Sequence, residues 1–232
     1  MKRNLEKSTG MADEAEQGLF LDRQSEVNIA EGMRPHWMQD GAIVFLTIRL
    51  ADSLPKDVLE AWDRERLAYL HSIGLYSEHW LDGVRQLSRQ QRHAFDRRFR
   101  RLKEIELDRC HGECPLRRPE LAQIVSDAFR FFDDDRYLMG DYVVMPNHAH
   151  CLVVFPDSVS MRRQCTSWTR FTATKINRLL GRRGDFWQEE PFDHLVRSES
   201  QLDYLRRYIA ENPVKAKLRP GEYLYRRSER KF

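Results

Sequence analysis

Two apolar runs joined by two residues restrict the fold of this chain more than any other feature of its sequence. They extend over residues 137–145 and 148–155 and are rich in Val, Leu, Met and aromatic residues. Pro146 and Asn147, which separate the runs, are residues typical of turns. The two runs are therefore predicted to form a β-hairpin or a tightly bent pair of strands.

The rest of the chain alternates between expected strands and expected helices. A buried strand is predicted over residues 42–50, because this run is rich in β-branched and aromatic residues and ends at a turn signal. Helices are expected over residues 55–70, 119–132, 161–180 and 199–212. The last of them is expected to stop before Pro213. With a short extended stretch over residues 185–196, this order indicates an α+β sandwich with one antiparallel sheet and helices on one face.

The chain is predicted to form one core domain with additions. Its 232 residues, 41% of them hydrophobic, are enough for such a domain. Residues 1–36 are polar and lack sustained periodicity, so we expect a flexible N-terminal segment there. Residues 37–232 are expected to form the domain. Within it, residues 73–117 are very basic and helical in pattern but interrupted, and they are predicted to be an insertion.

The distribution of charge is more informative than its total. A formal net charge of +3 is too small to indicate nucleic-acid binding by itself. However, no acidic residue lies between Asp157 and Asp185, a segment that contains Arg162, Arg163, Arg170, Lys175, Arg178, Arg182 and Arg183. A second basic run surrounds Phe95 and Phe99 with Arg97, Arg98, Arg100 and Arg101. The second run is typical either of a surface that holds phosphates and stacks bases or of a solvated helix face.

A His-x-His pattern opens the second run of the hairpin. If His148 begins a strand, the pleat places His148 and His150 on one face and Ala149 on the other. Neutral imidazoles bind divalent first-row metals, so the two rings could hold one ion. By itself the pattern is also typical of surface histidines.

The last expected helix carries a tyrosine and an asparagine four residues apart. A helix brings Tyr208 and Asn212 to the same face, one turn apart. A phenol and an amide oxygen would then lie together. A tyrosine beside Leu205 and Ile209 is also typical of a core residue with a hydrogen-bonded hydroxyl.

In combination these motifs resemble the HUH single-tyrosine transposases, and in particular the REP-associated tyrosine transposases. The resemblance covers about two thirds of the chain, in the same order. It runs through Phe45-Leu-Thr-Ile-Arg-Leu50, Cys114-Pro-Leu-Arg-Arg-Pro119, Val144-Met-Pro-Asn-His-Ala-His150, Phe186-Trp-Gln188, Phe192-Asp193 and Tyr208-Ile-Ala-Glu-Asn-Pro-Val214. The pairing of Met-Pro-Asn-His-x-His with a downstream Tyr-Ile-x-x-Asn-Pro is its most specific part.

The resemblance implies a fold, a reaction and a set of site residues. The fold would be ferredoxin-like, with the His-x-His strand central and the tyrosine on a following helix. His148, His150 and Asn212 would bind Mg²⁺ or Mn²⁺, and Tyr208 would be the nucleophile that forms a 5′-phosphotyrosine intermediate. The substrates would be single-stranded DNA hairpins, including REP-type palindromes, and the process DNA transposition. Relatives work either as dimers or as monomers, which leaves a homodimer open.

The same resemblance suggests residues that contact DNA. Arg170, Lys175 and Arg178, together with Arg162 and Arg163, would face DNA phosphates. Trp187 and Phe192 would stack on unpaired bases, although aromatic residues in such positions also serve in packing.

Three departures from the family pattern are evident. Ala149 is small for the bulky hydrophobic middle position of the motif, the insertion over residues 73–117 is long, and the tail after Tyr223 lacks a Trp-Ser-Ser sequence. The last two features would alter the choice of DNA.

Three alternatives remain open from the sequence. One is a non-catalytic module that binds single-stranded nucleic acid without a metal. Another is an HUH-like phosphoesterase that uses water in place of Tyr208. The third concerns Cys110, His111 and Cys114, which suggest a zinc site, although their spacing is not that of a zinc knuckle.

The expected location is the bacterial cytoplasm, in association with the nucleoid. The sequence begins without an apolar signal segment and contains four cysteines, which favours a reducing compartment. It has no run of roughly 18 apolar residues, so no membrane partner is expected.

Overall fold

The computed structural model describes residues 19–22, 28–30, 36–188, 191–230 and 232. The chain divides into two compact units, one formed by residues 1–51 with 115–232 and the other by residues 52–114. Most of the N-terminal segment that is predicted to be flexible lies outside the described residues. Within it and just after it, β1 (Asn28–Ala30) and β2 (His36–Met38) pair as an antiparallel ribbon.

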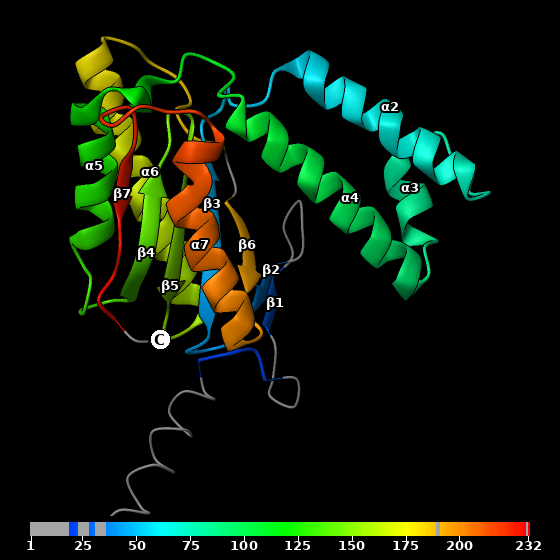
Figure 1. The fold of residues 1–232 in the computed structure, drawn as a ribbon, viewed down its shortest axis with the longest axis horizontal. Helices are drawn as coiled ribbons and strands as arrows, with labels where there is room; N and C mark the ends of the chain where they lie inside the picture. Colours follow the sequence, from blue (N-terminus) through cyan, green and yellow to red (C-terminus); the bar gives the residue numbers. More distant parts are fainter. Residues whose placement is uncertain (1–18, 23–27, 31–35, 189–190, 231) are drawn as a thin grey trace, which may run out of the picture. The chain divides into compact units, whose positions relative to one another are not determined.

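The larger unit is built on a five-stranded sheet in which all neighbouring strands are antiparallel (Figure 1). In spatial order its strands are β6 (Phe192–Leu195), β3 (Ile43–Arg49), β5 (His148–Val154), β4 (Leu138–Val144) and β7 (Leu224–Arg226). The hairpin predicted from the sequence is β4 and β5, with the amide of Met145 donating to the carbonyl of His148 at 2.8 Å across the turn. It places β5 at the centre of the sheet, between β3 and β4.

Strand order and helix order together define the fold. Along the chain, β3 is followed by α5 (Pro119–Arg130), then by β4 and β5, then by α6 (Ser158–Leu180) and β6. This is the βαββαβ order of a ferredoxin-like sandwich, and the spatial order of its four strands is the one that such a fold requires. The α+β, ferredoxin-like fold class is therefore confirmed, with β7 added outside β4.

Helices α5 and α6 cover one face of the sheet. Pro119 occupies the first turn of α5, and this helix buries Leu121, Val125 and Phe129 against the sheet. At the start of α6 the carboxylate of Asp157 accepts a hydrogen bond from the Ser160 amide at 2.8 Å, and α6 ends at Gly181, whose φ of 63° is favourable for glycine.

Helix α7 (Glu199–Lys215) covers the other face (Figure 1). Its residues Leu202, Leu205 and Ile209 pack against Phe45 and Leu152 of the sheet. The expectation of helices on one face thus holds for α5 and α6, the two helices of the ferredoxin-like plan, whereas α7 is an addition to it.

The prediction that α7 stops before Pro213 is wrong. The helix continues to Lys215, with Pro213 in its last turn. The proline only removes one backbone donor there, and helical bonding resumes beyond it, because the amide of Ala216 donates to the carbonyl of Asn212 at 3.0 Å.

The smaller unit contains α2 (Lys56–Ser72), α3 (Trp80–Arg85) and α4 (Arg89–Asp108). It has a core of its own, formed by Leu70, Val84, Phe95 and Phe99. The unit begins at Asp52, so α2 belongs to it and the inserted part starts earlier than the predicted residue 73. Because Phe95 and Phe99 are buried, they are not available to stack on bases, so the base-stacking part of the interpretation of the second basic run is wrong.

Candidate metal and nucleophile site

Two histidines meet on the face of the sheet that α7 covers. His148 and His150 are two residues apart on β5, and their ring centroids lie 4.6 Å apart. Ala149 and Cys151, between and after them, belong to the core on the opposite face. Both histidine side chains are buried. The pleat of one central strand is therefore enough to bring the two rings together.

Each ring is oriented by a hydrogen bond to its Nδ1 atom. His148 Nδ1 lies 2.7 Å from Asn147 Oδ1, and His150 Nδ1 lies 2.9 Å from Thr47 Oγ1. Because the Asn147 oxygen can only accept, His148 Nδ1 carries the proton, and in the neutral ring the lone pair is on Nε2. Such a second partner is what fixes a metal-binding histidine in its tautomer.

The environment of His148 favours its neutral form. Burial, and then the positive charge of Arg49, lower the pKa of His148 to about 3. Arg49 is the residue opposite His148 in the register of β3 and β5. At neutral pH the ring is therefore uncharged, which is the form that binds a metal ion.

Tyr208 lies beside this pair. Its ring centroid is 5.3 Å from that of His150 and 6.0 Å from that of Phe45. The side chain is half-buried, and Lys215 Nζ lies 5.6 Å from the centroid of its ring. The phenol thus reaches the surface next to two buried imidazoles.

Asn212, one turn beyond Tyr208 on α7, is fully buried. Neither atom of its side-chain amide has a hydrogen-bond partner among the described residues, and the same is true of His148 Nε2. Buried polar atoms without partners are rare and commonly indicate a bound ion or water. These atoms, an amide oxygen and an imidazole nitrogen, are of the types that bind divalent first-row metals.

The side chains near the two histidines offer few combinations of metal ligands. In the described part of the chain, no group of three His, Cys, Asp or Glu side chains is arranged to hold a metal ion. Asn212, buried on the helix that covers these histidines, is the amide that the sequence predicts as a third ligand, and two imidazoles with an amide are donor types that fit a divalent first-row ion.

The zinc interpretation of Cys110, His111 and Cys114 has no support among the described residues. His111 Nε2 lies 2.8 Å from Glu106 Oε2, and the thiol of Cys114 donates to the carbonyl of Cys110 at 2.8 Å. These contacts engage the side chains of His111 and Cys114, two of the three residues that would have to bind zinc.

The residues predicted to contact DNA are not all at this site. Arg162, Arg163, Arg170, Lys175 and Arg178 are exposed, but they lie on α6, which covers the face of the sheet opposite to His148 and His150. Trp187 is buried, and its indole N–H donates to Thr172 Oγ1 at 2.8 Å, so the prediction that it stacks on bases is wrong. Of Phe192 the structure describes only the backbone, in β6, and its side chain lies outside the described residues.

Sequence reasoning missed three residues of this site. Thr47 and Arg49 lie opposite His150 and His148 in the register of the sheet, and Asn147 precedes His148 in the turn. All three stand inside the motifs quoted above. These residues were therefore visible in the sequence, but only the pairing of β3 with β5 shows that Thr47 and Arg49 lie next to the histidines.

Comparisons with known proteins gave one result. A solved structure of a REP-associated tyrosine transposase bound to a REP hairpin is similar to this chain, with a TM-score of 0.39 and 16% sequence identity over 80% of this chain and 74% of the other. No protein family model and no curated protein matches the sequence. No helix among the described residues is both long and apolar enough to cross a membrane.

Proposed function

We propose that this protein is a metal-dependent endonuclease and strand transferase that acts on single-stranded DNA and uses Tyr208 as its nucleophile. One observation carries the proposal: the half-buried phenol of Tyr208 lies beside two buried imidazoles whose orientations are fixed by hydrogen bonds. The ring centroid of Tyr208 is 5.3 Å from that of His150. Such a site would place a nucleophile beside a pair of metal ligands.

In this proposal His148, His150 and Asn212 bind Mg²⁺ or Mn²⁺. A bound ion would polarise a phosphate oxygen and offset the charge that develops on it during the reaction. Asn147 and Thr47 hold the two rings, and Arg49 adds a positive charge next to His148. The site would therefore present positive charge on one side of the phosphate and the phenol of Tyr208 on another.

The reaction is a transesterification in which the number of phosphodiester bonds does not change. The hydroxyl oxygen of Tyr208 forms a bond with phosphorus, and the bond from phosphorus to the 3′ oxygen breaks. The leaving oxygen takes the electron pair of that bond and the proton that the phenol loses. The products are a 5′-phosphotyrosine and a free 3′-hydroxyl, and a 3′-hydroxyl can reverse the step without ATP.

The substrate class comes from the sequence motifs. They resemble those of the REP-associated tyrosine transposases, so we propose DNA hairpins with single-stranded flanks as substrates. The exposed cations of α6, Arg162, Arg163, Arg170, Lys175 and Arg178, would contact phosphates away from the site of cleavage.

A labelled DNA hairpin tests the nucleophile. With Mn²⁺ and a hairpin that carries its label on the 3′ side of the cleavage site, the wild-type protein should give a covalent protein–DNA band on a denaturing gel. Tyr208→Phe should abolish this band but leave hairpin binding intact, because only the hydroxyl is removed. Tyr225→Phe, at a partly exposed tyrosine on β7, is the matched control and should keep the band.

The other outcomes distinguish the alternatives. A covalent band that persists in Tyr208→Phe would show that another residue is the nucleophile. Cleavage without any protein-linked DNA would indicate a phosphoesterase that uses water. Binding that is the same with chelator, with no scission in Mn²⁺, would indicate a module that only binds nucleic acid.

A further inference from the structure

A second tyrosine lies on the same side of α7 as Tyr208, one turn closer to the start of the helix. The side chain of Tyr204 is 56% exposed. Its ring centroid is 6.4 Å from that of Tyr208, and the two ring planes differ by only 23°. An aromatic side chain that is more than half exposed thus lies beside the proposed nucleophile, with its ring nearly parallel to that of Tyr208.

The two edges of α7 differ in what covers them. On one edge Arg206 donates to the carbonyl of Arg230 at 3.0 Å, so the C-terminal segment lies against the helix there. On the other edge, Tyr208 contacts Phe45 of β3 at 6.0 Å between ring centroids. Tyr204 and Tyr208 lie two residues before and two residues after Arg206, so they face the side of α7 away from this contact.

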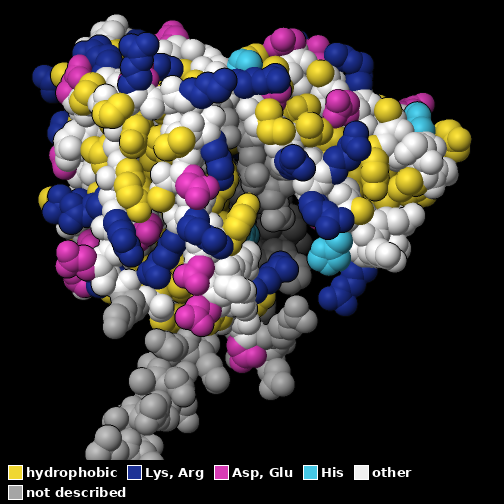
Figure 2. All heavy atoms as spheres, viewed as in Figure 1, with side chains coloured by type: hydrophobic (Ala, Val, Ile, Leu, Met, Phe, Trp, Pro, Cys, Tyr) yellow, Lys and Arg dark blue, Asp and Glu magenta, His cyan; other side chains and the backbone are white. Residues whose placement is uncertain are grey.

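Charge alone would bind a nucleic acid weakly along this helix. Lys and Arg side chains are dispersed among Asp and Glu on the face of the larger unit seen in Figure 2. On α7 itself, Lys215 forms an ion pair with Glu211 at 3.1 Å, and Asp203 lies next to Tyr204. A strand held at Tyr208 would therefore need a contact that does not depend on charge.

Stacking on an aromatic ring is such a contact. A base that stacks on an exposed aromatic side chain gains about 5- to 150-fold in affinity, whatever its sequence. Of the other aromatic residues considered for this role, Trp187, Phe95 and Phe99 are buried, and the side chain of Phe192 lies outside the described residues. Tyr204 is exposed and stands next to the nucleophile.

We propose that Tyr204 binds an unpaired base of the DNA strand by stacking, one or two nucleotides from the phosphate that Tyr208 attacks. One helical turn is about 5.4 Å, which a strand spans within about two nucleotides. This inference rests on the proposed function, since it places the base relative to the reaction of Tyr208. It also explains a preference for single strands, because a base in a duplex has no free face to offer.

The test measures binding without chemistry, in the Tyr208→Phe background. The probe is a single-stranded oligonucleotide in which 2-aminopurine replaces one base at a time, with Mg²⁺ present. Quenching should be strongest at one position, should persist when Tyr204→Phe is added, and should disappear with Tyr204→Leu, together with a rise in Kd of about 5- to 150-fold. Tyr225→Leu is the control for loss of a tyrosine elsewhere and should leave both readouts unchanged.

Two results would overturn the inference. One is an unchanged Kd and quenching pattern in Tyr204→Leu, and the other is an equal loss of affinity for a fully paired duplex, which would indicate a general effect on folding. Loss of quenching with Tyr204→Phe would also overturn it, because it would assign the role to the hydroxyl and not to the ring.

Failure of this inference can be told apart from failure of the proposed function. If wild-type protein forms the covalent band and Tyr204→Leu binds as tightly as its parent, only the stacking inference fails. If no covalent band forms with any metal, but Tyr204→Leu still abolishes quenching, stacking stands and the transferase proposal fails.

Discussion

The two faces of the five-stranded sheet bury polar side chains in opposite ways. On the face covered by α5 and α6, buried polar groups are paired: Ser126 Oγ lies 2.7 Å from the hydroxyl of Tyr142, and Trp187 donates to Thr172. On the face covered by α7, His148 Nε2 and both amide atoms of Asn212 have no hydrogen-bond partner among the described residues. The first face is a conventional core with paired polar groups. The second face contains buried polar atoms that are available to bind a ligand.

This difference has an energetic meaning. A buried polar atom without a partner destabilises a protein by about 1–3 kcal/mol, while a paired one contributes on the order of 1 kcal/mol. A fold that keeps several unpaired atoms on one face has a lower stability than the same fold with an apolar face. A ligand that binds those atoms recovers the loss, because it stabilises only the folded state. Variants on the two faces should therefore respond differently.

The largest effect is expected in the core under α5. Phe129 is buried and contacts the rings of Tyr142 and Trp168, with centroids 5.5 and 4.9 Å away. Phe129→Ala should lower the free energy of unfolding by about 3–5 kcal/mol, because it leaves a cavity. The neighbouring Phe131, 76% exposed, is the control, and Phe131→Ala should change it by about 0.5 kcal/mol or less. Urea denaturation followed by circular dichroism measures both. Equal effects at the two positions would contradict a core on this face.

The proposed metal ligands should control the reaction on the other face. His148→Ala and His150→Ala should each lower the rate of covalent protein–DNA formation by about 100-fold or more, since each removes a ligand. Binding of Mn²⁺, measured by electron paramagnetic resonance, should weaken in parallel.

A third histidine provides the comparison. His194 on β6 lies on the same face, with its ring 5.2 Å from that of Phe45, but it is not in the proposed ligand set. His194→Ala should keep Mn²⁺ binding. A loss of metal in this variant, with binding retained in His148→Ala, would show that the assigned ligands are wrong.

Asparagine variants on the two faces should change stability in opposite directions. In metal-free protein, Asn212→Leu should raise the free energy of unfolding by about 1–3 kcal/mol, because two unpaired buried atoms are replaced by apolar ones of similar size. It should also remove the stabilisation that Mn²⁺ gives to the wild-type protein.

Asn177 on α6 is the matched control. Its amide donates to the carbonyl of Gly184 at 2.9 Å and accepts from Arg182 Nε at 3.0 Å. Asn177→Leu gains the same helix propensity but loses both bonds, so it should destabilise the protein by about 1 kcal/mol. If both variants lower the stability in thermal melts, the contrast between the two faces fails at these positions.

Much of the fold could be predicted because it follows from periodicity. The turn at Pro146 and Asn147 fixes the β4–β5 hairpin, and the period of two along β5 places His148 and His150 on one face before any packing is known. The four helices and β3 follow in the same way from apolar spacing and from proline and glycine at their ends.

Features that depend on tertiary packing could not be predicted. Nothing in the sequence of α7 tells which face of the sheet it covers, because the connection from β6 allows either. Burial of Trp187, Phe95 and Phe99 likewise depends on neighbours from distant segments. The basic residues near them in the sequence favoured exposed rings that stack on bases, which is the opposite of what the structure shows. The partners of the two imidazoles depend on the register of β3 against β5, which an isolated motif does not contain.

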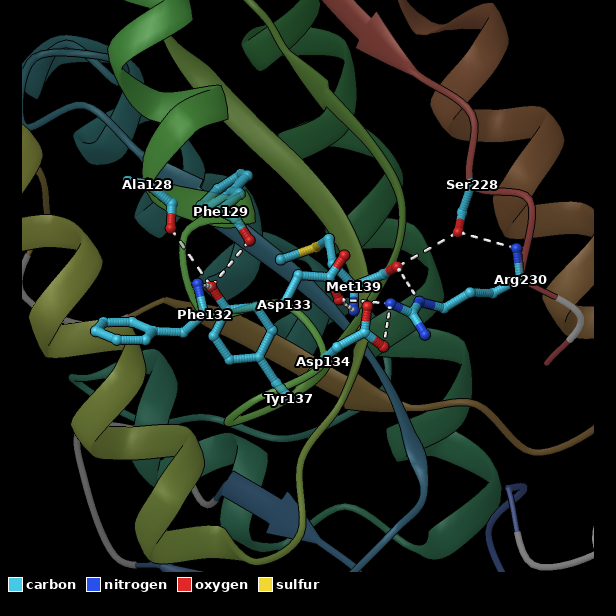
Figure 3. A network of polar contacts seen from close by, with 9 residues as sticks. All are labelled: Ala128, Phe129, Phe132, Asp133, Asp134, Tyr137, Met139, Ser228 and Arg230. Carbon is cyan, nitrogen blue, oxygen red and sulfur yellow. Dashed lines mark hydrogen bonds and ion pairs between the residues drawn. The ribbon is translucent and has the colours of Figure 1, made fainter.

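At pH 7 the smallest effect is expected at a hydroxyl on the paired face, and the effect should depend on pH. Tyr137 is buried, and its hydroxyl donates to the carbonyl of Phe129 at 2.9 Å (Figure 3). The same hydroxyl accepts from Trp168 Nε1 at 3.3 Å. Tyr137→Phe should therefore lower the free energy of unfolding at pH 7 by only about 1 kcal/mol. Tyr76, 77% exposed, is the control, because Tyr76→Phe removes a hydroxyl without removing a buried hydrogen bond.

At alkaline pH the same residue should lower the free energy of unfolding. Burial raises the pKa of Tyr137 from 10.0 to about 12, so the folded protein holds this proton more tightly than the unfolded chain does. The contribution of Tyr137 is fully present below pH 10 and is lost as the pH rises through 12, by about 3 kcal/mol in total. Tyr137→Phe should reduce this loss without removing it, since burial also raises the pKa of Tyr142. Urea denaturation from pH 9 to 12 measures the slopes, and equal slopes for Tyr137→Phe and wild type would show that the phenol of Tyr137 ionises as readily in the folded protein as in the unfolded chain.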